Sequence, residues 1–162
     1  MDLIIKPKQA CNFRCTFCSS NDIAEDYREQ RPLDTLFAFL MTHDTSRIIV
    51  NGGDPLMMPP EYYWEILAFM KENGMKTTLD FTTNLWDFYL HPDKWSSLFL
   101  QPGVSVCTSF QYGGERRLAN GNEYTEEQFC KIMKQFTERI GYTPLFIAVI
   151  TARIYTNVLV RF

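Results

Sequence analysis

Short apolar runs alternate with amphipathic helical patterns along this chain, and that alternation limits the possible folds more than any other feature. The apolar runs predict strands at residues 3–5, 47–51, 77–82, 104–110 and 145–150. Apolar residues at helical spacing predict helices over residues 33–42, 60–70, 92–98 and 126–140. Strands that alternate with helices pair in parallel through right-handed crossovers. The sequence therefore predicts an α/β fold with a parallel sheet covered by helices.

Local signals mark the ends of two of these helices. Thr125, followed three residues later by Gln128, is a capping box, and Gly141 stands where that helix is expected to stop. A proline pair ending at Pro60 opens another helix, and Gly74 stands where a left-handed C-cap would close it. Both helices are therefore expected to begin and end close to these residues.

The composition indicates one packed domain. The chain has 162 residues, of which 46% are apolar and 15% aromatic, so it has the length of a single domain and enough apolar surface for a core. No repeat, low-complexity tract or Gly/Ser linker interrupts it. We predict a core domain over residues 1–150. The atypical tail over residues 151–162 is either an extra strand or an early end of the chain.

Charge and hydropathy exclude several classes of partner. With 16 basic and 19 acidic residues the formal charge is −3, which disfavours a nucleic-acid partner. The first residues lack the charged and apolar regions of a signal peptide, and no apolar run reaches the roughly 18 residues of a membrane helix. We therefore expect a cytoplasmic protein with no nucleic-acid and no membrane partner.

Three of the five cysteines lie in one short loop. Cys11, Cys15 and Cys18 form a C-x3-C-x2-C pattern directly after the first predicted strand. An odd number of cysteines argues for reduced or metal-bound thiols rather than a disulfide framework. Three thiolates on a four-iron cube leave one iron open, as a reactive cluster requires. Zinc is the alternative, but structural zinc takes four ligands, and His43 and His91 lie outside the loop.

Further motifs follow the later strands. Phe17 is an aromatic residue just before the last cysteine of the loop, and Gly52-Gly53-Asp54-Pro55 follows the second predicted strand. Thr82-Thr83-Asn84 and Ser109-Phe110-Gln111 follow the third and fourth strands. With the cysteine loop, this set resembles the radical S-adenosylmethionine (radical SAM) superfamily, which has a GGEP-like motif after its second strand. The last two motifs are similar to the TN and S-x-D elements of members that modify peptides and proteins. Asp54 replaces the commoner Glu, and Gln111 replaces the Asp.

The resemblance implies a fold, two cofactors and a set of site residues. The implied fold is an incomplete parallel (β/α) barrel, similar to the family's (β/α)6 partial barrel, with about four βα units plus a fifth strand. The implied cofactors are a [4Fe-4S] cluster and SAM, whose amino and carboxylate groups bind the open iron. The metal ligands would be Cys11, Cys15 and Cys18. The residues implied in cofactor binding are Phe17, Gly52, Gly53, Asp54, Pro55, Asn84, Ser109 and Gln111.

The two glycines have a specific expected role. Glycine permits a positive φ and lets bare backbone approach a ligand, so Gly52 and Gly53 are expected to present carbonyls to the SAM ammonium. The alternative is an ordinary strand-to-helix turn. On the first interpretation, Gly53→Val weakens SAM binding while the cluster, held on a different loop, survives.

Four other residues have weaker signals. Arg116 and Arg117 either pair with a carboxylate of SAM or substrate or are solvated loop charges, and the second interpretation is somewhat favoured. Cys107, in a strand, and Cys130, on a helix, are expected to be small buried apolar residues.

Three functional hypotheses remain open on the sequence. The first is an enzyme that reductively cleaves SAM to a 5′-deoxyadenosyl radical and modifies a substrate, with a peptide or protein as the expected class. Its implied electron donor is a flavodoxin or ferredoxin. The second is a truncated or inactive radical SAM-like protein. The third is a non-enzymatic metal-binding α/β module.

Overall fold

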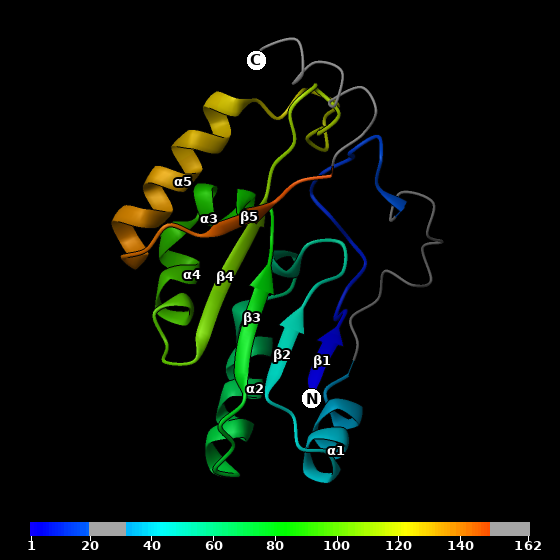
Figure 1. Cartoon of the computed structure of the whole chain (residues 1–162), viewed down its shortest axis with the longest axis vertical. Helices are drawn as coiled ribbons and strands as arrows, with labels where there is room; N and C mark the ends of the chain where they lie inside the picture. Colours follow the sequence, from blue (N-terminus) through cyan, green and yellow to red (C-terminus); the bar gives the residue numbers. More distant parts are fainter. Residues whose placement is uncertain (20–31, 150–162) are drawn as a thin grey trace.

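The computed structural model describes residues 1–19 and 32–149, and the predicted tail at 151–162 lies outside them. Its centre is a single sheet in which neighbouring strands are all parallel and follow the order β1-β2-β3-β4-β5 (Figure 1). The strands are β1 (Asp2–Ile5), β2 (Arg47–Val50), β3 (Thr78–Thr82), β4 (Val104–Ser109) and β5 (Leu145–Ile147). The predicted parallel α/β fold is therefore confirmed.

The helices connect successive strands. They are α1 (Asp34–Thr42), the short 3-10 turn η3 (Pro55–Met57), α2 (Pro60–Glu72), α3 (Trp86–Leu90), α4 (Pro92–Phe99) and α5 (Glu126–Ile140). The capping box of Thr125 and Gln128 is present, and Gly141 ends α5 with φ 92°. The sequence patterns did not predict η3 and α3.

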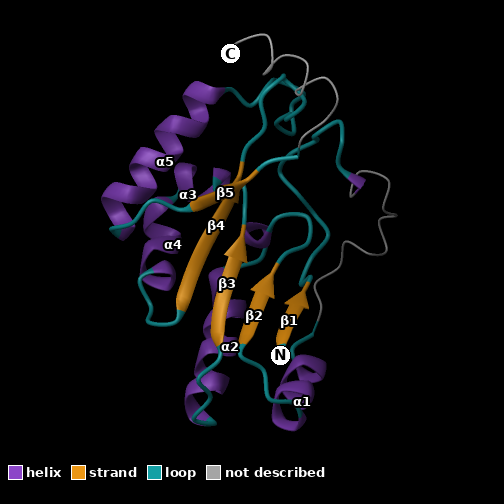
Figure 2. Ribbon diagram, in the orientation of Figure 1, coloured by secondary structure: helices purple, strands orange, loops and turns teal. Residues whose placement is uncertain are grey.

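The sheet order explains why the core lies on one face. When each strand pairs with the next in sequence and every crossover is right-handed, all the helices fall on the same side. The strands accordingly bury every second residue: Ile48 and Val50 of β2, Leu79 and Phe81 of β3 and Val106 of β4. In Figure 2 the strands pass in front of α2. Aromatic rings complete this layer, with Tyr63, Trp95, Phe99 and Phe136 all fully or nearly fully buried.

The opposite face of the sheet is less buried and carries both apolar and polar side chains, with Ile4 and Ile49 on β1 and β2. Its side chains include Asp80 and Ser105, joined by a hydrogen bond from the serine hydroxyl to the aspartate at 2.9 Å. Among the described residues β5 is the last strand of the sheet, and its side chains Leu145, Phe146 and Ile147 are all more than half exposed. A parallel sheet covered by helices on one face is the arrangement of an incomplete barrel.

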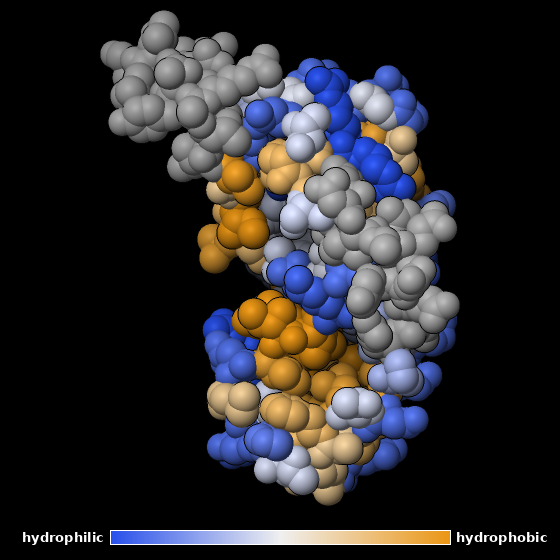
Figure 3. All heavy atoms as spheres, turned by 90° about the vertical axis from the view of Figure 1, so that its right-hand side faces the viewer, coloured by the Kyte–Doolittle hydropathy of each residue, from blue (hydrophilic) through white to orange (hydrophobic). Residues whose placement is uncertain are grey.

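The side of the molecule next to β1 has an apolar surface. Apolar side chains gather over the lower half of the molecule as seen from the β1 side (Figure 3), where residues of β1, α1 and α2 line a groove of about 500 Å³. Within the described ranges, no helix has the length and apolar character needed to cross a membrane.

Candidate metal centre

The cysteine loop leaves the carboxyl end of β1 and is held in place by the segment that follows β4. Three backbone hydrogen bonds join them: Arg14 N–H to Arg117 O at 2.7 Å, Thr16 N–H to Glu115 O at 3.0 Å and Ala119 N–H to Asn12 O at 3.0 Å. An antiparallel bridge pairs Phe13 with Leu118. These contacts form a short antiparallel ladder between residues 12–16 and 115–119, which fixes the side-chain directions of the loop.

The glycine turn after β2 packs directly against the start of the cysteine loop. A Cβ atom placed on Gly53 would lie 2.1 Å from the carbonyl oxygen of Ala10 and 2.3 Å from that of Gln9. The Asp54 N–H donates to the same Ala10 carbonyl at 2.9 Å. Gly52 has φ 133°, and a Cβ there would lie 2.4 Å from the Lys8 carbonyl oxygen.

This contact corrects the expectation that the two loops act separately. Gly52 needs both its positive φ and its missing side chain, whereas Gly53 has no positive φ and is required for close packing alone. Because Gly53 touches the backbone that leads into Cys11, a side chain there must displace the cysteine loop. Contact of either glycine with SAM stays a prediction.

Asp54 joins the glycine turn to the motif that follows β3. Its side chain is 2% exposed and accepts hydrogen bonds from Leu56 N–H at 2.9 Å, Asn84 N–H at 2.7 Å and the Thr83 hydroxyl at 2.9 Å. Burial raises the pKa of Asp54 to about 6, even though these three donors oppose the shift. The carboxylate is therefore a structural link between two loops, and Pro55 begins η3 beside it.

The side chain of Asn84 links the motif after β3 to the cysteine loop. Its side-chain amide donates to Asn12 Oδ1 at 2.7 Å and lies 3.9 Å from Cys11 Sγ, while its oxygen accepts from Trp86 N–H at 2.8 Å. The Phe13 N–H also points at Cys11 Sγ, at 3.3 Å. Asn84 thus reaches the first cysteine of the loop, and its contact with a cofactor stays a prediction.

The three thiols of the cysteine loop influence one another's pKa values. Burial first, and then the charge of Asp54, raise the pKa of Cys11 to about 12, and Cys15 and Cys18 add smaller increases. Burial also raises the pKa of Cys15, so a bound metal must displace protons from these groups. No disulfide joins any of the five cysteines, all of which lie in the described ranges.

The arrangement of these thiols fits a cluster. Among residues 1–19 and 32–149, no three His, Cys, Asp or Glu side chains gather closely enough to hold one metal ion. A zinc ion draws its thiolates around one centre, whereas each thiolate of an iron-sulfur cube binds its own iron and stands farther from the others. The three thiols lie near enough to influence one another electrostatically, and three thiolates from one loop can each bind a different iron of a cube.

Other predicted residues are spread around this centre. Gln111 is buried, donates to Glu115 at 2.5 Å, and leaves its Oε1 without a partner among the described residues. Ser109 ends β4 in a half-buried position. The Phe17 ring faces the guanidinium of Arg116, with 5.6 Å between Cζ and the ring centroid. None of these contacts tests SAM binding, which remains a prediction for each residue.

Arg116 is not the solvated loop charge that the sequence favoured. It is 7% exposed, its Nε has no hydrogen-bond partner in the described structure, and no described carboxylate pairs with it. Cys130 also departs from expectation, because it is exposed on α5, and Cys107 is only half-buried.

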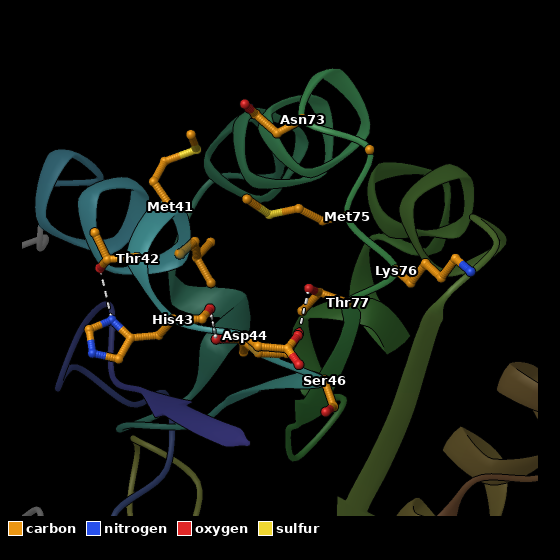
Figure 4. A pocket seen from close by; sticks show the side chains of 12 residues that line it. Met41, Thr42, His43, Asp44, Ser46, Asn73, Met75, Lys76 and Thr77 are labelled. Carbon is orange, nitrogen blue, oxygen red and sulfur yellow. Dashed lines mark hydrogen bonds between the residues drawn. The ribbon is translucent and has the colours of Figure 1, made fainter.

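A separate groove lies at the other end of the strands. It has a volume of about 640 Å³ and is lined by the end of α1, the loop between α1 and β2, and the loop between α2 and β3 (Figure 4). There the Thr77 hydroxyl donates to the Thr45 carbonyl at 2.7 Å. In parallel α/β barrels this amino end serves stability, while the carboxyl end carries chemistry. The cysteines and the glycine turn lie at the carboxyl end.

Comparison with known proteins decides the family. The family model described as the Radical SAM superfamily matches residues 5–152, which is most of the chain. The chain belongs to the radical SAM superfamily. Members of this superfamily use a [4Fe-4S] cluster and SAM, as the cysteine loop predicted.

Solved structures and a curated protein support the radical SAM fold. The chain superposes on native anSMEcpe with bound AdoMet with a TM-score of 0.68 and 18% identity, covering 91% of this chain and 42% of that one. A histidine-tagged form of anSMEcpe with bound AdoMet gives a TM-score of 0.70 at 17% identity, with the same coverage. The 7-carboxy-7-deazaguanine synthase of Bacillus cereus is 25% identical over 109 residues, covering 62% of this chain and 45% of that protein. The predicted partial barrel is thus confirmed, and the chain spans less than half the length of each relative.

Proposed function

We propose that this chain is the SAM-cleaving core of a radical SAM enzyme that modifies a peptide or protein. The observation that carries the proposal is the packing of four segments at the carboxyl edge of the sheet. These are the cysteine loop, the turn at residues 52–55, Asn84 and the segment 115–119. Parallel α/β barrels place their reacting groups at this edge.

The residues of the site have distinct proposed roles. When bound, the cluster and SAM supply one-electron reductive cleavage of the sulfonium, which gives methionine and a 5′-deoxyadenosyl radical. Cys11, Cys15 and Cys18 would each ligate one iron. The Phe13 N–H and the Asn84 amide point at Cys11 Sγ, and such donors stabilise a thiolate ligand. The electron donor is proposed to be a flavodoxin or ferredoxin.

The proposed substrate class rests on the motif after β3. Thr82-Thr83-Asn84 is similar to the TN element of members that modify peptides, and Asn84 lies beside the first cysteine. Two of the structural neighbours are anSMEcpe with bound AdoMet and a peptide, Cp18Cys or Kp18Cys. A small heterocyclic substrate is the second candidate, because the curated relative is named for 7-carboxy-7-deazaguanine.

The first experiment is anaerobic reconstitution of the chain with iron and sulfide. We expect iron and sulfide each to approach about four per chain, and 5′-deoxyadenosine to form when SAM and a reduced flavodoxin or dithionite are added. Stoichiometric zinc without sulfide would instead identify a metal-binding module. A cluster without 5′-deoxyadenosine would identify an inactive protein. A rate raised by peptides and not by deazaguanine heterocycles would support the peptide class, and the reverse would overturn it.

Cysteine variants separate ligands from bystanders. We expect Cys15→Ala to lose the cluster, because two thiolates hold a cube poorly. Cys107→Ala should keep the iron content of the wild type and lose only about 1 kcal/mol of stability, since its half-buried thiol lies outside the site. Iron and sulfide analysis after identical reconstitution is the measurement. Equal iron loss in both variants would overturn the ligand assignment.

A further inference from the structure

Arg116 is a buried cation with no anion beside it in the described structure. Its side chain is 7% exposed, Nε lacks a hydrogen-bond partner, and no described carboxylate pairs with it. Burial lowers the pKa of Arg116, but an arginine of this kind stays protonated. Burying an uncompensated charge is costly, so a folded protein ordinarily supplies an opposite charge.

The ladder between the two loops places Arg116 opposite the middle cysteine. The hydrogen bonds of Arg14 with Arg117 and of Thr16 with Glu115 enclose the pair Cys15 and Arg116 between them. In an antiparallel ladder, the pair that lies between two hydrogen-bonded pairs brings its opposed side chains closest, and both point to one face. Arg117, one residue later, points to the other face.

Two further contacts agree with this direction. The guanidinium of Arg116 lies over the Phe17 ring, 5.6 Å from its centroid, and Phe17 lies in the turn that the Cys18 N–H to Cys15 O hydrogen bond closes. The thiols of Cys15, Cys11 and Cys18 all act electrostatically on Arg116. The guanidinium of Arg116 therefore lies next to the cysteine loop, on the side that faces segment 115–119.

We propose that Arg116 is the counter-charge of the iron-sulfur cluster and sets its reduction potential, a role that rests on the proposed function. A doubly positive cube core held by three thiolates has one net negative charge, and one-electron reduction adds a second. A fixed buried cation stabilises the reduced form more than the oxidised form, because the attraction grows with the negative charge. Arg116 gains and loses no proton in this step, and the electron comes from the external reductant.

The test is a redox titration of the reconstituted protein without SAM, followed by electron paramagnetic resonance of the reduced cluster. We expect Arg116→Met to lower the ratio of reduced to oxidised cluster about tenfold at a fixed potential, a shift of about 59 mV for one electron. Arg116→Lys should keep most of the wild-type ratio. Arg117→Met is the matched control, since it removes the same charge from the opposite face and should leave the ratio unchanged.

Several outcomes decide the inference. If Arg116→Met takes up no cluster while Arg116→Lys does, the positive charge is needed to hold the anionic cluster, which supports the proposal. Loss of the cluster in both variants would make the role structural and overturn it. An unchanged potential, with or without weaker SAM binding, would also overturn it. A wild-type chain that binds no cluster would instead defeat the proposed function, so the two failures are distinguishable.

Discussion

Replacing Gly53 with alanine is expected to destabilise the protein strongly and to impair cluster assembly. The added Cβ would lie 2.1 Å from Ala10 O, 2.3 Å from Gln9 O and 2.4 Å from the Ala10 carbonyl carbon. All three atoms belong to the backbone, so no side chain can rotate away to make room. Overpacking of this kind typically costs about 1–3 kcal/mol and sometimes more. We expect a loss of about 3 kcal/mol here, at the upper end of that range, with iron uptake reduced several-fold.

The comparison with Gly74→Ala isolates the close contact from the general cost of replacing glycine. Gly74 has φ +64°, and a Cβ added there would have no atom within 4 Å, so its substitution should cost about 1 kcal/mol and leave iron uptake unchanged. Urea unfolding and iron analysis of both variants are the measurements. Wild-type iron content in Gly53→Ala would show that the cysteine loop tolerates the displacement. The Gly53→Val substitution, expected from the sequence to affect SAM alone, should be more damaging still.

Much of the fold was predictable because its signals are local. The capping box at Thr125 and the glycine at 141 define α5 without reference to any other segment. The two missed elements also had local signals. The Asp54 side chain caps η3, and Pro55 occupies its first position. The Asn84 side chain accepts from Trp86 N–H at the start of α3. These signals were assigned to the cofactor motifs instead, and each side chain in fact serves the backbone as well.

The contacts within the site were less predictable, because they join segments far apart in the chain. The cysteine loop alone indicated a cluster, since its spacing is specific. Gly53 packs on Ala10, about 40 residues away in the chain, and Cys15 pairs with Arg116, about 100 residues away. Both contacts depend on the paths of the loops between them. No periodicity in either segment reports such a register. The burial of Arg116 therefore became apparent only in the folded structure.

Asp54→Asn is expected to weaken the link between the turn after β2 and the motif after β3. The carboxylate accepts from Asn84 N–H at 2.7 Å and from the Thr83 hydroxyl at 2.9 Å and 3.1 Å. An asparagine side chain has only one accepting oxygen. Its amide nitrogen would replace the other carboxylate oxygen, where it would face a donor and leave the buried Asn84 N–H without an acceptor. An unsatisfied buried donor costs about 1–3 kcal/mol, and we expect a loss of about 2 kcal/mol at neutral pH. Asp44→Asn, at an exposed loop position, should change stability by less than about 0.5 kcal/mol.

The pH dependence provides an independent check on the same carboxylate. The pKa of Asp54 is raised from 3.8 to about 6 in the folded protein, so between these values the folded state binds more protons than the unfolded state. The contribution of this carboxyl to stability is then expected to rise as the pH falls through about 6 and to level off below about 4, with a slope of up to about 1.4 kcal/mol per pH unit. The asparagine variant lacks this slope, so the stability difference between wild type and Asp54→Asn should widen on acidification. Anaerobic urea unfolding from pH about 7.5 to about 5, on cluster-loaded and cluster-free chains, measures it. A difference that stays constant or narrows would mean that Asp54 is ionised throughout this range and that its three donors outweigh the cost of burial.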